Sequence, residues 1–207
     1  MVNVHDIVRF QDRSVITFHE TVPDWLYTRP ASQHYAVARR MKTTASTVAI
    51  GIRGKERSER IAGFINEQDI EQVITPQSLV RNLAQYRDSS FYPFLSEVDT
   101  IIAPFRLEWG PTGSIGFELA TGIPVATETS DLDMTVYVPP DLDYQVLEQL
   151  YEELQQCSFR IDVQIEFEDA GAALLPDIIK FKNGFLLRTS SGPLMASIIN
   201  GQVRIKA

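Results

Sequence analysis

Residues 131–138 read Asp-Leu-Asp-Met-Thr-Val-Tyr-Val, in which polar and apolar side chains alternate without a break. Alternation with a period of two is typical of a strand with one buried face. Leu132 and Met134 are therefore expected to face the core, whereas Asp131 and Asp133 project side by side from the opposite face. Two carboxylates at that spacing resist ionising together unless a cation screens them. The run predicts a strand whose polar face can carry a cation site, and an ordinary polar strand face is the alternative interpretation of the pair taken alone.

A second alternating run follows at residues 160–167, and it places Asp162 on its polar side. Leucines and valines at helical spacing predict a helix over residues 142–154, between the two strands. A third carboxylate on a neighbouring strand would complete a two-metal site with ions about 3.5–4 Å apart. Mg²⁺ is the expected cation, because it takes carboxylate oxygens and keeps waters for a phosphate ligand. Asp131, Asp133 and Asp162 are the predicted catalytic and metal-binding residues.

A Gly113-Ser114 pair precedes these strands and is expected to begin a short helix that Gly122 and Pro124 end. Glycine lets the backbone approach a ligand, and the free N–H groups of the first helical turn attract phosphate. Gly113 and Ser114 are therefore candidate phosphate-binding residues. An ordinary helix cap, which Ser114 would also satisfy, is the alternative interpretation.

Charge is distributed unevenly along the chain. Residues 1–90 hold 12 Lys and Arg against 10 Asp and Glu, whereas residues 91–207 hold 7 against 17. The most basic stretch runs from Arg39 to Arg60, where seven Lys and Arg accompany two Glu. Such a stretch can attract phosphate or an acidic partner, and its alternative interpretation is an ordinary solvated surface.

The pattern of predicted elements indicates an α+β protein of two domains. A β-branched strand is expected at residues 47–52, and Thr75-Pro76 is expected to open a helix. Serines and prolines after residue 88 indicate a boundary there. Residues 1–88 are expected to form a smaller, basic α/β domain that binds substrate. Residues 89–207 are expected to form the catalytic domain, a mixed sheet flanked by helices.

The composition excludes several classes of protein. The chain has 207 residues, of which 44% are hydrophobic, so disorder is a poor interpretation. A net charge of -8 argues against a nucleic-acid or anionic-membrane binder. Cys157 is the single cysteine, and the sequence has neither a leader pattern nor a long apolar run. These features predict a cytoplasmic protein.

The motifs together resemble the polymerase-beta type nucleotidyltransferase superfamily, whose pattern is Gly-Ser, then two aspartates on one strand, then one on a later strand. A longer phrase, WGPTGSIGFELATGIPV at 109–125 followed by SDLD at 130–133, is similar to the malonate decarboxylase holo-acyl-carrier-protein synthases. These enzymes are also called phosphoribosyl-dephospho-CoA transferases. Further similarity lies in VAIGIRG at 48–54 and LLRT at 186–189. The spacing of 16 residues between Ser114 and Asp131 is longer than in simple nucleotidyltransferases.

The resemblance implies a defined reaction. A serine hydroxyl of the apo acyl carrier protein of malonate decarboxylase attacks the α-phosphate of 2′-(5″-triphosphoribosyl)-3′-dephospho-CoA, and pyrophosphate leaves. In this scheme Asp131 and Asp133 hold Mg²⁺ on the triphosphate, and Asp162 binds a second ion or accepts the serine proton. Guanidinium groups bind phosphate oxygens, and the candidates for this role are Arg53, Arg57, Arg60 and Arg188.

Two other functions are compatible with the same residues. One is a nucleotidyltransferase that moves a nucleotide from ATP to a protein or small molecule. The other is a non-catalytic adaptor that docks a carrier protein through the basic stretch. An adaptor has no need for Asp131, Asp133 and Asp162 to converge.

Overall fold

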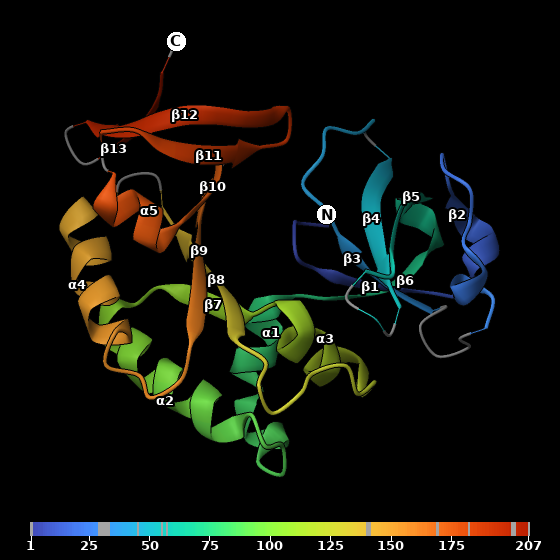
Figure 1. The fold of residues 1–207 in the computed structure, drawn as a ribbon, viewed down its shortest axis with the longest axis horizontal. Coiled ribbons are helices and arrows are strands. Elements are labelled where there is room, and N and C mark those ends of the chain that lie inside the picture. Colours follow the sequence, from blue (N-terminus) through green and yellow to red (C-terminus); the bar gives the residue numbers. More distant parts are fainter. Residues whose placement is uncertain are drawn as a thin grey trace. The chain divides into compact units, whose positions relative to one another are not determined.

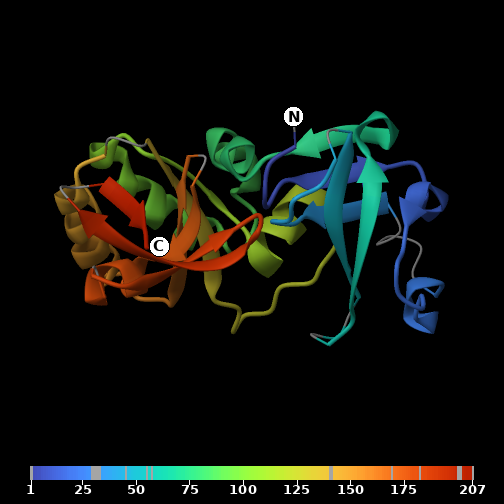
Figure 2. The same ribbon diagram turned by 90° about the horizontal axis from the view of Figure 1, so that it is seen from above.

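The computed structural model describes residues 2–28, 34–44, 46–54, 56, 58–139, 142–168, 170–181, 183–199 and 202–206. It is a mixed α+β structure with two sheets (Figures 1 and 2), which confirms the expected class. The chain divides into two compact units. The first comprises residues 1–75 and 117–125, and the second comprises residues 76–116 and 126–207. In the described residues no helix is long and apolar enough to cross a membrane.

The first division falls between Thr75 and Pro76, whereas the sequence indicated a boundary near residue 88. The start of helix α1 (Pro76–Arg81) packs against strand β7 (Glu108–Pro111) of the second unit. A Cβ atom added to Gly110 would lie 2.2 Å from the carbonyl oxygen of Pro76. The missing side chain at Gly110 therefore allows the backbone of α1 to lie directly on β7, and this contact places α1 in the second unit.

The first unit is built on an antiparallel sheet of six strands in the order β2-β5-β4-β3-β1-β6. Its strands are β1 (Ile7–Phe10), β2 (Ile16–Thr17), β3 (Tyr35–Ala38), β4 (Thr47–Arg53), β5 (Arg60–Asn66) and β6 (Ile70–Ile74). In the described part of residues 1–75, helical structure is limited to 3-10 turns. The domain was expected to be α/β, but it is a β-sheet domain. Buried and less buried residues alternate along its short apolar segments, and this period of two favours strands over helices.

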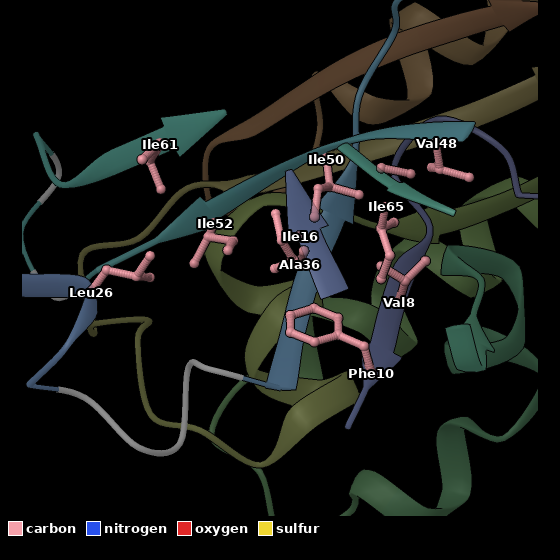
Figure 3. Close-up of a cluster of buried hydrophobic side chains, with 11 residues drawn as sticks. Val8, Phe10, Ile16, Leu26, Ala36, Val48, Ile50, Ile52, Ile61 and Ile65 are labelled. Atoms are coloured by element: carbon pink, nitrogen blue, oxygen red, sulfur yellow. The ribbon is translucent and has the colours of Figure 1, made fainter. Parts of the chain in front are cut away.

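Apolar side chains from most strands of this sheet form a single buried cluster (Figure 3). Val8 and Phe10 from β1 meet Ile50 and Ile52 from β4, and Ile65 is added from β5. All five are at most 2% exposed. Side chains that alternate along neighbouring strands stack on one face of the sheet, so burial of this face accounts for the stability of the first unit.

The second unit contains a sheet of seven strands in the order β13-β12-β11-β10-β9-β8-β7. Its remaining strands are β8 (Leu132–Val138), β9 (Ile161–Phe167), β10 (Gly171–Leu174), β11 (Phe185–Thr189), β12 (Gly192–Ile199) and β13 (Gln202–Ile205). Its helices besides α1 are α2 (Tyr92–Ile102), α4 (Tyr144–Leu154) and α5 (Leu175–Lys180). Helix α3 (Gly113–Thr121) begins in this unit, and its last residues group with the first unit. The expected mixed sheet flanked by helices is therefore present.

Only β8 and β9 run parallel among the strand pairs of the described residues. Parallel neighbours need a crossover, and α4 provides it. The side chain of Asp143 caps α4 by accepting a hydrogen bond of 3.0 Å from the backbone N–H of Gln145. Leu147, Leu150 and Leu154 of α4 are buried, in agreement with the predicted helix and its apolar face.

The buried carboxyl group of Asp6 in the first unit generates a prediction about stability. Asp6 is 1% exposed, and its Oδ2 accepts a hydrogen bond of 2.7 Å from the backbone N–H of Asn3. Burial raises the pKa of Asp6 from 3.8 to about 6, and the hydrogen bond from Asn3 opposes part of that rise. The folded protein therefore binds this proton more tightly than the unfolded chain does. The resulting stabilisation is complete below pH 3.8 and is lost as the pH rises through 6.

We predict that Asp6→Asn, which keeps an oxygen acceptor for Asn3, removes this pH dependence. A difference of about two pKa units corresponds to at most about 3 kcal/mol of unfolding free energy. Urea unfolding of the wild type and the variant at pH 4, 5, 6 and 7 measures the unfolding free energy of each protein. The free energy of the wild type should fall relative to that of the variant across this range. A difference that stays constant with pH would contradict the assignment.

Candidate active site

The parallel pairing of β8 and β9 brings the predicted carboxylates together. Asp133 and Asp162 are register partners, so their side chains leave the sheet on the same face. Asp131 lies one residue before β8, on the same side of the alternation. The side chains of Asp131 and Asp162 are 37% and 47% exposed, respectively. The three carboxylates therefore share one solvent-accessible end of the sheet.

Arg160 bridges two of these carboxylates. Its guanidinium nitrogens lie 3.4 Å from Oδ2 of Asp131 and 3.6 Å from Oδ2 of Asp162. Arg160 was predicted only as the start of a strand, but it lies two positions before Asp162, and the alternation therefore puts both side chains on the same face. Its side chain is 70% exposed, so the ion pairs are weak and a stronger cation can replace the guanidinium.

The glycine-serine turn lies directly against Asp133. Gly113 has a φ of +60°, and a Cβ atom at this position would lie 2.0 Å from Oδ2 of Asp133. The backbone N–H of Thr112 donates a hydrogen bond of 2.8 Å to the carbonyl oxygen of Asp133. Ser114 follows in the first turn of α3, where unpaired N–H groups present partial positive charge. The structure thus places the predicted phosphate-binding turn beside the predicted carboxylates.

Thr135, the next residue of β8 on this face, is fully buried. Its register partner on β7 is Gly110, which Pro76 covers. Among the described residues the Thr135 hydroxyl has no hydrogen-bond partner. The sequence placed Thr135 correctly on the polar face, but the covering by α1 depends on a contact between distant segments that alternation does not reveal.

Arg188 extends the polar face toward the far strands of the sheet. It lies on β11, and its Nη1 donates a hydrogen bond of 3.1 Å to Oε1 of Gln164 on β9. Gln164 is two residues beyond Asp162 and therefore points to the same side. Arg188 is thus on the face of the carboxylates, two strands away from β9 in the order β11-β10-β9.

The other predicted arginines belong to the first unit. Arg53 and Arg60 are register partners at one end of the β4–β5 hairpin, and Arg57 lies outside the described residues. At the opposite end of the same hairpin, which begins at Thr47, there is a cavity of about 530 Å³. It is lined by Thr17, His19, Met41, Lys42, Thr43, Thr44, Thr47, Phe64, Ile65 and Asn66. The first unit therefore offers two separate surfaces for an anionic ligand.

A second cavity, of about 250 Å³, lies at the start of β9 and reaches Arg160 and Asp162. Cys157 also lines it. Burial, together with the charge and hydrogen bond of Glu97, raises the pKa of the Cys157 thiol to about 11. The thiol is protonated at neutral pH and is not a nucleophile.

The oxygen donors of this face suit Mg²⁺, and Gly113 leaves space beside Asp133 that any side chain would fill. In the described part of the chain, however, no three His, Cys, Asp or Glu side chains are grouped closely enough to hold a metal ion. Arg160 contacts Asp131 and Asp162 instead. Chemically the residues fit a magnesium ion, and the carboxylates must turn from Arg160 to bind one.

Two family models match the chain. The model of the phosphoribosyl-dephospho-CoA transferase MdcG N-terminal domain matches residues 3–76, and that of the C-terminal domain matches residues 78–198. No solved structure gives a significant match.

Curated relatives carry the same name. The chain is 33% identical over 178 residues to a phosphoribosyl-dephospho-CoA transferase of Pseudomonas putida, covering 84% of each chain. It is 30% identical over 192 residues to the transferase of that name from Klebsiella pneumoniae strain 342, covering 91% of each. These matches make the chain an enzyme of the transferase class, so the adaptor alternative does not hold. From its two family domains and its relatives, the chain belongs to the phosphoribosyl-dephospho-CoA transferase family.

Proposed function

We propose that the enzyme transfers the 2′-(5″-phosphoribosyl)-3′-dephospho-CoA group from its triphosphate precursor to a serine of the apo acyl carrier protein of malonate decarboxylase, in the cytoplasm, and releases pyrophosphate. The observation that carries the proposal is the meeting of Asp133 with its register partner Asp162 and with the Gly113 turn. A phosphate-binding turn beside paired carboxylates is the arrangement that nucleotidyl transfer requires.

In this proposal each residue of the site has a distinct role. Gly113, Ser114 and the first turn of α3 bind the phosphates that leave, because the N–H groups there attract anions. Asp131 and Asp133, with Asp162, would hold Mg²⁺, which neutralises charge on the triphosphate when bound. Asp162 is exposed and accepts the proton of the attacking serine hydroxyl. The new bond joins the serine oxygen to the α-phosphorus, and the bond to pyrophosphate breaks.

Arginines supply the remaining charge. Arg188 lies on the same face and donates to Gln164, so a modest rotation directs its guanidinium toward a bound phosphate. In the first unit, Arg53 and Arg60 are register partners across the β4–β5 hairpin, so their side chains leave the same face of the sheet. Guanidinium groups bind phosphate oxygens in a bidentate manner. We propose these arginines as the contacts of the first unit with the donor.

Incubation of the enzyme with the apo carrier protein, the triphosphoribosyl donor and Mg²⁺ tests the proposal. Intact-mass spectrometry should show the carrier gaining the mass of the phosphoribosyl-dephospho-CoA group. ATP in place of the donor is the control. Modification of the carrier with a nucleotide from ATP, and none from the donor, would instead identify another nucleotidyltransferase.

The carboxylates generate the first prediction about activity. Asp131→Asn and Asp133→Asn should each abolish most transfer, because the amide is nearly isosteric but lacks the charge that holds Mg²⁺. Asp162→Asn should keep donor binding near normal and slow the chemical step by about 10²–10⁴-fold. Single-turnover kinetics and donor binding by calorimetry measure both effects. Transfer within a few-fold of the wild type in all three variants would contradict the site.

The two ends of α3 generate a second prediction. Gly113 and Gly122 both have positive φ, so alanine at either position costs about 1 kcal/mol of backbone strain. A Cβ at Gly113 collides with the carboxylate of Asp133, whereas a Cβ at Gly122 has nothing within 4 Å. Gly113→Ala should therefore abolish transfer, and Gly122→Ala should keep it. Similar activity in the two folded variants would show that the turn does not position Asp133.

The two ends of the β4–β5 hairpin generate a third prediction. The double variant Arg53→Gln/Arg60→Gln should raise the KM for the donor and weaken its dependence on salt. Lys42→Gln is the matched control, because Lys42 lines the cavity at the opposite end of the hairpin, about 20 Å along the strand. A raised donor KM in Lys42→Gln alone would assign donor binding to the cavity. A change confined to the KM of the carrier would assign the arginines to carrier docking.

A further inference from the structure

The last 30 residues of the chain are basic, whereas the residues before them in the second unit are acidic. Residues 91–177 hold 17 Asp and Glu against 2 Arg, whereas residues 178–207 hold no acidic residue and five basic ones. The basic residues are Lys180, Lys182, Arg188, Arg204 and Lys206. Arg188 and Arg204 lie on strands β11 and β13, at the orange-to-red end of the sheet in Figure 1, so these strands carry basic and no acidic side chains in an otherwise acidic unit.

The same strands expose large apolar side chains. Five of the nine exposed large hydrophobic residues in the described chain belong to them, namely Leu186, Leu194, Met195, Ile199 and Ile205. Leu194 pairs with the buried Leu187, and Ile205 pairs with the buried Ala196, so these two lie on the opposite face from the other three. Isolated exposed apolar residues are ordinary, whereas a group on one face with polar residues around it marks an interaction surface.

Strand register shows which of these residues share a face. Leu186 pairs with Met195, and they are 47% and 45% exposed. Arg188 lies two residues from Leu186, and Ile199 lies four residues from Met195, so both join the same face. Arg204 joins it from β13 through its partner Ser197. These residues, Leu186, Arg188, Met195, Ile199 and Arg204, are called the hairpin face.

The hairpin face is continuous with the candidate active site. Arg188 pairs with Ala172 on β10, and Ala172 pairs with Glu166 on β9, so these positions lie on one side of the sheet. The hydrogen bond from Arg188 to Gln164 likewise crosses from β11 to β9 on this side of the sheet. A protein seated on the hairpin face would therefore lie on the side of the sheet that carries Asp162.

We propose that the hairpin face docks the protein acceptor, through an acidic surface that also presents apolar side chains. This inference rests on the proposed function, because it assigns the acceptor of that reaction. Charge complementarity identifies the partner as acidic, and the exposed apolar residues supply the area that a purely ionic contact lacks. A second copy of this chain is a poorer occupant, because the commonest dimers are two-fold symmetric and would place two basic hairpin faces against each other.

Kinetics with each substrate varied test the proposal. The variants are Leu186→Ser/Met195→Ser, which removes the central apolar pair, and Arg204→Glu, which reverses an exposed charge. Each should raise the KM for the apo carrier by about tenfold and leave the donor KM within about twofold. Arg204→Glu should also flatten the salt dependence of carrier binding. Val73→Ser and Arg87→Glu, at exposed positions outside these strands, are the controls and should change neither KM.

An unchanged carrier KM, or an equal rise in the donor KM, would overturn the docking assignment and leave the proposed function intact. If the wild type transfers nothing, the proposed function fails, and calorimetry of the apo carrier with donor-free enzyme decides the docking. The docking assignment is supported if the control variants bind the carrier and the hairpin variants do not. It is overturned if the wild type does not bind the carrier. Sedimentation showing wild-type self-association that Leu186→Ser/Met195→Ser abolishes would assign the face to a second copy and overturn the proposal.

Discussion

The parallel pairing of β8 with β9 is the constraint on which the rest of the second unit depends. It sets Asp133 opposite Asp162, and a shift of one residue would turn either carboxylate into the core. Because the other strand pairs described in this sheet are antiparallel, this pair alone requires a crossover, and α4 fills that role by covering the apolar face. The cap at Asp143 and the buried leucines of α4 thus contribute to the geometry of the carboxylates, although none of them touches the site.

Much of the β8–β9 pair could be predicted from the sequence, because the patterns that specify it lie within short segments of the chain. The alternation in residues 131–138 and 160–167 specifies both strands and the face of each carboxylate, and the helical spacing between them specifies α4. The parallel direction then follows from the helix that separates the strands. The neighbourhood of Gly113 and Asp133 was accessible only through a resemblance, since sixteen residues and a loop separate Ser114 from Asp131.

The features that the sequence did not reveal depend on contacts between distant segments. Alternation places Thr135 on the polar face, yet the backbone of Pro76 covers it by packing on Gly110. The same contact assigns α1 to the second unit, whereas composition alone indicated a division at a cluster of serines and prolines. In the first unit, short apolar runs leave the choice between strand and helix open, and pairing across the sheet decides it.

The helix ends around the carboxylates have an electrostatic consequence. Helix α3 begins beside Asp133, and α4 ends at Leu154, which lines the same cavity as Asp162 and Arg160. A helix carries about half a positive charge at its start and about half a negative charge at its end. The positive end of one helix and the negative end of another therefore flank the three carboxylates. The dipoles of the two helices therefore act in opposite directions at this end of the sheet. The start of α3 attracts anionic oxygens toward Gly113, and the end of α4 attracts cations toward Asp162.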